Sequence, residues 1–229
     1  MAEIKVFSDA AALAEGAADL IAEALTTTPD LALSGGSTPE ATYRRLSERD
    51  IDWGRVDLWL GDERWVPHDD ADSNYPMARR AFGANAHRIL PTPWVSGVGP
   101  AAAAGAYQQL LQARIPDGDR IGPGVVLLGL GDDTHTASLF PGSSALFETD
   151  RDYVATFVDA KGVWRLTLTL PAIHRAALVV FLVSGAGKAA ALADVVSPDS
   201  SAPAALAARG AGRVIWMVDE EAASGLPTR

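Results

Sequence analysis

One ten-residue segment, Gly129–Ser138, carries the side chains best suited to proton transfer. It follows Val125–Leu128, an apolar run whose length and composition predict a short buried strand. Glycines at the end of a strand let the backbone turn sharply and approach a ligand closely. His135 can exchange a proton near neutral pH, and Asp133 can orient its imidazole and stabilise its charged form. On these residues alone, a structural or solvated loop histidine is an equally good interpretation.

Strand-like and helix-like segments alternate along the chain. Short apolar or alternating runs predict strands at Ile4–Phe7, Leu31–Leu33, Val56–Leu60, Val125–Leu128, Arg165–Leu170, Leu178–Val183 and Val214–Val218. Helical spacing predicts helices at Asp9–Thr26, Pro39–Arg49, Asn74–Phe82, Ala101–Arg114 and Gly187–Val196. The alternation predicts one α/β domain over residues 1–229, with a doubly wound, mostly parallel, Rossmann-like sheet and helices on both faces. The Ala202–Ala208 segment is either a helix or a surface loop.

Four of these strands end in polar or glycine-rich loops. The loops are Ser34–Pro39, Gly61–Arg64, the segment that contains His135, and Ser184–Lys188. In an open parallel sheet, ligands bind beyond the carboxyl ends of the strands. We therefore expect the four loops to meet at one edge of the sheet and to form a binding site.

The Ser34–Pro39 loop suits an anion. Gly35 and Gly36 let backbone amides turn inward. Ser37 and Thr38 add hydroxyl donors at the start of a predicted helix. Equally well, the segment is an ordinary strand-to-helix turn in which one of the two hydroxyls caps the helix.

Lys188 follows a glycine turn at a predicted helix start, a position from which a lysine reaches a phosphate. The surrounding sequence is not a nucleotide-binding P-loop, because Leu182 stands where that motif has its first glycine and Ala189 where it has serine or threonine. A solvated helix lysine is the alternative interpretation, and it is favoured when Lys188 is considered alone.

Two further segments carry charged candidates. Arg165 opens an alternating run and is either an edge-strand arginine or a second phosphate ligand. The Asp62–Arg64 segment is either a surface charge cluster or, because tryptophans flank it, a partly buried group with a function.

Composition excludes several classes of function. The chain has 229 residues, 48% of them hydrophobic, and a net charge of −10, which disfavours a nucleic-acid-binding surface. It has no cysteine, so disulfides, thiol catalysis and cysteine-bound metals are excluded. The nucleophile-elbow pattern Gly-x-Ser-x-Gly is absent, and His68 with its neighbouring aspartates is better interpreted as a solvated loop than as a metal site. We expect no cofactor, no obligate protein partner, no membrane segment and no signal peptide, and hence a cytoplasmic protein.

In their order and spacing, these loops resemble the 6-phosphogluconolactonase family, whose superfamily also holds glucosamine-6-phosphate deaminase. The resemblance runs from Ser8 to about Val218. Its motifs are Ser34–Pro39, Gly61–Arg64 with Val66-Pro67, Ser73-Asn74, Gly129–Gly131 with Asp133, His135–Pro141, Arg165–Thr169, and Gly185 with Gly187-Lys188. One departure is Thr134, where the family usually has glycine, and a positive φ there would strain a threonine.

The resemblance implies hydrolysis of 6-phospho-D-glucono-1,5-lactone in the oxidative pentose phosphate pathway. It implies that His135 activates water as a general base, that Asp133 orients the imidazole, and that Arg64 stabilises negative charge in the intermediate. The residues expected to hold the phosphate are Gly35, Gly36, Ser37, Thr38, Arg165 and Lys188. Asp62 and Asn74 are expected to hold sugar hydroxyls or Arg64 itself.

Glucosamine-6-phosphate deaminase is the alternative enzyme in the superfamily. It carries a glutamate five residues after the histidine, where this chain has Phe140, and a tyrosine where this chain has Arg64. A phenylalanine cannot transfer protons, so the lactonase is favoured. A third possibility is a sugar-phosphate sensor without catalysis, although no attached DNA-binding or oligomerisation segment is recognisable.

Overall fold

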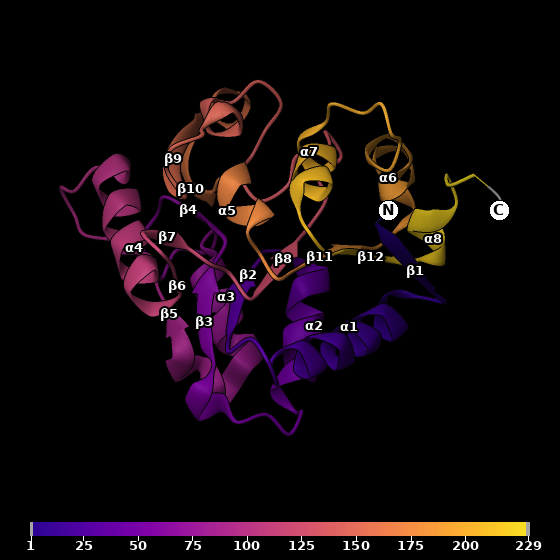
Figure 1. Ribbon diagram of the computed structural model, residues 1–229, viewed down its shortest axis with the longest axis horizontal. Coiled ribbons are helices and arrows are strands. Elements are labelled where there is room, and N and C mark those ends of the chain that lie inside the picture. Colours follow the sequence, from indigo (N-terminus) through magenta and orange to yellow (C-terminus); the bar gives the residue numbers. More distant parts are fainter. Residues whose placement is uncertain (1, 228–229) are drawn as a thin grey trace.

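The computed structural model describes residues 2–227, apart from the side chain of Ala160, and is built around a seven-stranded parallel sheet (Figure 1). In spatial order its strands are β1 (Glu3–Phe7), β12 (Val214–Asp219), β11 (Leu178–Val183), β8 (Val125–Leu128), β2 (Asp30–Leu33), β3 (Asp57–Leu60) and β5 (Ile89–Leu90). Every neighbouring pair is parallel. Apart from β1, which lies at the edge beside β12, the chain progresses outward from β2 through β3 to β5 and from β8 through β11 to β12. The order therefore reverses between β2 and β8, where such sheets bind ligands.

Helices cover both faces of this sheet, which confirms the predicted doubly wound α/β fold. One face carries α1 (Ala10–Ala24), α2 (Ser37–Ser47) and α3 (Asn74–Phe82). The other carries α4 (Pro100–Arg114), α5 (Leu170–His174), α6 (Ala189–Val195) and α7 (Pro203–Gly210), with the short α8 (Glu220–Ala223) beside α6. Five 3-10 turns complete the helical elements: η1 (Trp53–Arg55), η2 (Gly83–Arg88), η3 (Ser144–Phe147), η4 (Asp159–Lys161) and η5 (Ala186–Lys188). The Ala202–Ala208 segment is therefore mostly helical.

Alternate strand residues divide the buried apolar side chains into two cores. In β2, Leu31 and Leu33 pack with α1 and α2, whereas Ala32 faces the opposite core. In a strand with helices on both sides, successive side chains enter different cores, so the whole run is apolar. This explains why β8 and β11 are recognisable as short continuous apolar segments.

The alternating run that begins near Arg165 does not belong to the parallel sheet. It forms β10 (Val163–Leu168), the central strand of an antiparallel sheet between β4 (Asp62–Arg64) and β9 (Tyr153–Val158). Of the two alternatives for Arg165, the edge-strand arginine was therefore wrong, because β10 is paired on both sides. Alternation is typical of a sheet with one solvated face, and here it marks this smaller sheet. A two-stranded hairpin, β6 (Pro116–Asp117) and β7 (Arg120–Ile121), lies beside α4.

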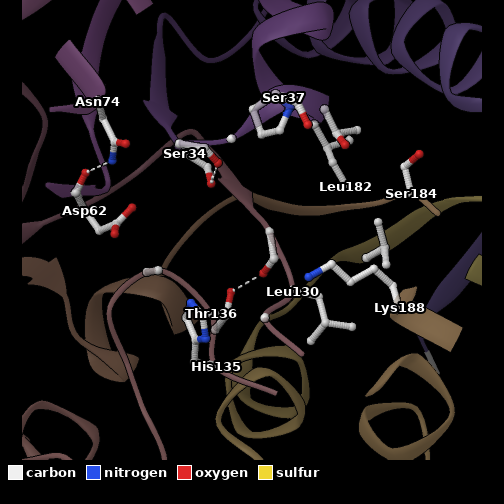
Figure 2. A pocket seen from close by; sticks show the side chains of 18 of the residues that line it. Ser34, Ser37, Asp62, Asn74, Leu130, His135, Thr136, Leu182, Ser184 and Lys188 are labelled. Carbon is white, nitrogen blue, oxygen red and sulfur yellow. Dashed lines mark hydrogen bonds between the residues drawn. The ribbon is translucent and has the colours of Figure 1, made fainter. Parts of the chain in front are cut away.

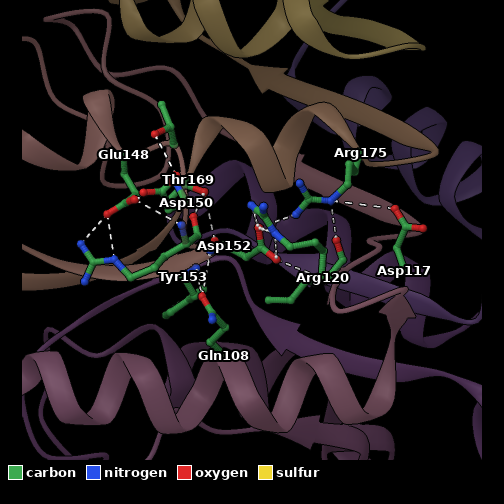
Figure 3. A network of polar contacts seen from close by, with 12 residues as sticks. Gln108, Asp117, Arg120, Glu148, Asp150, Asp152, Tyr153, Thr169 and Arg175 are labelled. Carbon is green, nitrogen blue, oxygen red and sulfur yellow. Dashed lines mark hydrogen bonds and ion pairs between the residues drawn. The ribbon is translucent and has the colours of Figure 1, made fainter.

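A buried carboxylate ties the smaller sheet to the rest of the molecule (Figure 3). Asp152 is fully buried and accepts hydrogen bonds from the guanidinium groups of Arg120 and Arg175 and, at 2.8 Å, from the amide of Ile121. Burial alone would raise the pKa of Asp152, but these hydrogen bonds and charges outweigh it and lower the pKa. From α4, Gln108 Oε1 accepts the amides of Asp152 and Tyr153, so the start of β9 is fixed from two sides.

No helix within residues 2–227 combines the length and the apolar character needed to cross a bilayer.

Candidate active site

A cavity of about 320 Å³ opens at the carboxyl ends of β11, β8, β2 and β3, where the strand order reverses (Figure 2). Its volume lies at the lower end of the range of small-molecule sites, about 300–1,000 Å³. The four loops expected at this edge all contribute to it. Ten of the eleven predicted site residues line it: Gly35, Gly36, Ser37, Thr38, Asp62, Arg64, Asn74, His135, Arg165 and Lys188. The eleventh, Asp133, contacts His135 from outside the lining.

The glycines of the loop after β2 are required by its geometry. A Cβ on Gly35 would lie 2.1 Å from Oδ1 of Asn74, so only a glycine allows that close approach. Gly36 has φ +115°, a conformation that side chains disfavour. The buried Tyr43 hydroxyl, from α2, holds the loop in place. It accepts a hydrogen bond from the Ser34 amide at 2.7 Å and donates one to the Ser34 carbonyl at 2.8 Å.

The same loop presents the start of α2 to the cavity. The residue before the helix is Gly36, and no side chain among residues 2–227 caps the helix, so the alternative interpretation in which Ser37 or Thr38 acts as the cap was wrong. The first amides of a helix have no partner within it, and they carry the positive end of the helix dipole. The amides and hydroxyls of Ser37 and Thr38 therefore remain available to an anion.

Two arginines stand side by side in the smaller sheet. Arg64 on β4 is directly opposite Arg165 on β10. The Nε atoms of both are buried and have no hydrogen-bond partner within residues 2–227. Burial, and secondarily the neighbouring Arg64 charge, lowers the pKa of Arg165, although Asp62 opposes this effect. Two adjacent cations with unused donors indicate a site for a negatively charged ligand.

The two acidic residues before Arg64, Asp62 and Glu63, have different roles. Glu63 is buried and accepts the amides of Arg64, Asn74 and Tyr75, so it fixes the start of α3, and burial raises its pKa. Asp62 lines the cavity, and its Oδ2 accepts the Ser138 hydroxyl at 2.7 Å. Ser138 is buried and does not line the cavity, and nothing in its sequence context indicated this contact.

The Asp62 backbone also fixes Asn74, whose Nδ2 donates to the Asp62 carbonyl at 2.9 Å. This bond was not expected, because Asn74 was predicted to hold a sugar hydroxyl or Arg64. The Asn74 oxygen remains beside Gly35 in the cavity.

The histidine loop forms a compact dyad. Nδ1 of His135 forms a hydrogen bond with Oδ1 of Asp133, which leaves Nε2 as the ring nitrogen for proton transfer. Although burial would raise the pKa of Asp133, its hydrogen bond with His135 lowers it. The imidazole also stacks on Phe140, with 4.1 Å between ring centroids. A Cβ on Gly131 would lie 2.0 Å from Nδ1, so this glycine makes room for the dyad.

Thr134 adopts the left-handed conformation, with φ +67°. The concern that this position needs a positive φ was therefore correct, and the threonine carries the strain expected of a β-branched residue there. The loop is nonetheless closed by two backbone bonds, from Thr134 to Gly131 and from Gly131 to His135. A third bond, from the Ala204 amide in α7 to the Thr134 carbonyl, holds it from outside at 3.2 Å.

Two lysines reach the cavity, of which only one was predicted. Lys188 in η5 lies 2.5 Å from Oδ1 of Asp132. Lys161 in η4 also lines the cavity, and its Nζ lies 5.2 Å from the centre of the Phe140 ring. Sequence reasoning missed Lys161 because only the antiparallel hairpin of β9 and β10 brings it back to the histidine loop.

Within residues 2–227 no cluster of three or more histidine, aspartate or glutamate side chains is arranged to hold a metal ion. Instead, Nε2 of His68 is 2.6 Å from the Thr92 carbonyl, and its ring packs against Tyr75.

Comparison with known proteins identifies the family of the chain. The family model described as glucosamine-6-phosphate isomerases/6-phosphogluconolactonase matches residues 8–216. The chain belongs to this family. A 6-phosphogluconolactonase of Nostoc sp. is 37% identical over 97% of this chain and 98% of its own. One of Streptomyces coelicolor is 36% identical over 98% of this chain and 95% of its own.

Solved structures of family members superpose over nearly the whole chain. A 6-phosphogluconolactonase from Trypanosoma brucei has a TM-score of 0.86 at 32% identity, covering 99% of both chains. One from Leishmania guyanensis has a TM-score of 0.89 at 27% identity and covers both chains completely, at 100% each. A monomeric glucosamine-6-phosphate deaminase shares the fold, with a TM-score of 0.81 at 22% identity over 97% of this chain and 99% of its own.

Proposed function

We propose that the chain hydrolyses 6-phospho-D-glucono-1,5-lactone to 6-phospho-D-gluconate, with His135 as the general base. The observation that carries this proposal is the His135–Asp133 dyad at the edge of a cavity that also holds, within residues 2–227, two arginine Nε donors without a hydrogen-bond partner and the start of α2 without a side-chain cap. A cyclic ester with a phosphate at its far end needs these two functions in one cavity. Membership of the family supports the same activity.

The phosphate end of the substrate would bind where the anion-binding groups meet. The amides and hydroxyls of Ser37 and Thr38, preceded by the Gly35–Gly36 turn, supply hydrogen bonds at the positive end of α2. Arg165 and Lys188 supply charge. Binding energy from this remote group holds the lactone so that its C1 lies near His135.

The chemical end would be served by the dyad and Arg64. Nε2 of His135 takes a proton from water while the water oxygen forms a bond to C1 of the lactone. Arg64 stabilises the negative charge that develops on the carbonyl oxygen. When the bond between C1 and the ring oxygen breaks, the imidazolium returns its proton to that oxygen, which gives the open-chain acid. Asp133 stabilises the charged imidazole between the two steps.

The structure gives a physical reason to favour this reaction over deamination. Phe140 stands where the deaminase has a glutamate, and its ring stacks on the imidazole of His135. The stacked ring excludes water from one face of His135 and offers no proton acceptor. Asp133 is thus the carboxylate that hydrogen-bonds the histidine.

The test is a rate measurement with freshly generated lactone, from which the spontaneous opening in water is subtracted. Saturable acceleration supports the lactonase. Ammonia release from glucosamine 6-phosphate would identify a deaminase instead. Binding of 6-phosphogluconate without acceleration of either reaction would indicate a sensor and overturn the proposal.

A further inference from the structure

We propose that Asp132 sets the affinity of the cavity for phosphate by competing with the ligand for Lys188. The inference rests on the proposed function, in which Lys188 is a ligand of the substrate's phosphate. Asp132 would thus be an internal competitor that limits how tightly substrate and product are held.

The two members of the Lys188–Asp132 ion pair differ in their exposure and in their position relative to the cavity. Lys188 lines the cavity, whereas Asp132 does not, and the Asp132 side chain is 81% exposed. Figure 2 shows the lysine extended from η5 toward the loop after β8. The carboxylate therefore holds the ammonium from the solvent side, at 2.5 Å. The hydrogen bond from Lys188, and then its charge, lowers the pKa of Asp132, so the carboxylate is ionised at neutral pH.

The other predicted phosphate ligands are not neutralised in this way. Arg165 forms no ion pair with a carboxylate within residues 2–227, and its Nε is unpartnered. In the described part of the chain, no side chain caps the start of α2. Among the predicted phosphate ligands, Lys188 is therefore the one whose charge is already paired with a carboxylate. An incoming phosphate must share the Lys188 ammonium with Asp132 or displace Asp132 from it.

The expected effect is modest, because the pair is partly solvated. Ion pairs of this exposure change an equilibrium by about two- to fivefold. Removing the Asp132 charge should therefore tighten phosphate binding by about that factor, and the gain should shrink as salt screens the pair.

A purely structural role makes a different prediction. Asp132 lies in the turn that the Thr134 amide closes onto the Gly131 carbonyl, directly before Asp133. If the pair only tethered this turn to η5, its loss would lower kcat through the dyad and would leave phosphate affinity unchanged.

The experiment compares Asp132→Asn with the wild type, using inorganic phosphate as the probe in calorimetric titrations and as an inhibitor of lactone hydrolysis. Asp50→Asn is the matched control, since this exposed aspartate follows α2 at the end remote from the cavity. Both variants are repeated in a Lys188→Met background, where an ion-pair effect disappears but a general charge effect persists.

We expect Asp132→Asn to lower the Kd of phosphate about two- to fivefold, Asp50→Asn to leave it unchanged, and Asp132→Asn to give no gain in the Lys188→Met background. An unchanged Kd, or an equal gain in both backgrounds, overturns the competition. Saturable lactone hydrolysis by the wild type, measured in the same preparations, shows whether the proposed function itself stands. A wild type that neither binds phosphate nor hydrolyses the lactone overturns both.

Discussion

Gly131 offers a test of whether the rate of hydrolysis depends on the geometry of the His135–Asp133 dyad, because the two side chains fill the space beside this glycine. A Cβ at this position would lie 2.0 Å from Nδ1 of His135 and 2.6 Å from Oδ1 of Asp133. To reach the 3.4 Å of ordinary contact, the ring must move by about 1.4 Å. Gly131→Ala therefore displaces the imidazole by more than the distance, about 1 Å, at which misplacement of a catalytic group slows a reaction.

A displacement of about 1 Å in a catalytic group can cost about 100-fold in rate. We expect Gly131→Ala to lower kcat for lactone hydrolysis by about 100-fold, while the inhibition constant of inorganic phosphate stays within about twofold. The two quantities should respond differently because the residues expected to bind phosphate lie outside the histidine loop, at the start of α2, on β10 and in η5. Steady-state kinetics with phosphate as a competitive inhibitor measures both quantities.

Gly129→Ala is the control, since it places the same methyl group two residues away in the same loop. Its Cβ would lie 3.8 Å from the Ser34 hydroxyl, an ordinary contact, and Gly129 does not have a positive φ. We expect a kcat within about twofold of the wild type. A folded Gly131→Ala protein with wild-type kcat would refute the geometric argument, as would equal losses in the two variants.

Two further predictions concern stability. Asp152→Ala leaves Arg120 and Arg175 without their buried carboxylate and should lower the free energy of unfolding by about 3 kcal/mol in urea titrations, a loss below about 1 kcal/mol being incompatible with the network. Burial raises the pKa of Asp30 from 3.8 to about 6, so the folded state binds a proton that the unfolded state releases between these pH values. Stability from this group is complete below the lower value and is lost as pH rises through 6, on the order of 3 kcal/mol in all. Asp30→Asn should remove this component, and an unchanged pH profile of unfolding between pH 4 and 7 would contradict it.

The sequence predicted the parallel sheet and the place of the site because both follow from local patterns. A strand with a helix layer on each side must be apolar throughout, which makes β8 and β11 recognisable. Parallel strands present their carboxyl ends together, so the loops with Ser37, His135 and Lys188 had to meet.

Other features depended on contacts between distant segments. The position of β10 in a separate antiparallel sheet follows from its pairing with β4 and β9, and β4 is a three-residue strand with no apolar pattern. Lys161 reaches the cavity only because that hairpin returns to the histidine loop. The pairing of Lys188 with Asp132 joins residues 56 positions apart, which no local spacing reveals.

The conformation of Thr134 was predictable in part from the local sequence, whereas the contacts that hold it come in part from a distant segment. A threonine at a position where the family usually has glycine indicated a strained loop, and Thr134 indeed has a positive φ, +67°. The bonds to Gly131 and Ala204 show how neighbouring segments hold the residue in this conformation.

The central claim is that Nε2 of His135 activates water against a lactone whose phosphate is held elsewhere in the cavity. The most direct test is the hydrolysis of freshly generated 6-phosphogluconolactone by the wild type and by His135→Gln, with phosphate binding measured in the same preparations. The account predicts saturable acceleration by the wild type. It predicts a loss of about 10²–10⁴ in kcat for the variant, with phosphate affinity nearly unchanged. A folded His135→Gln protein that retains wild-type turnover would contradict it.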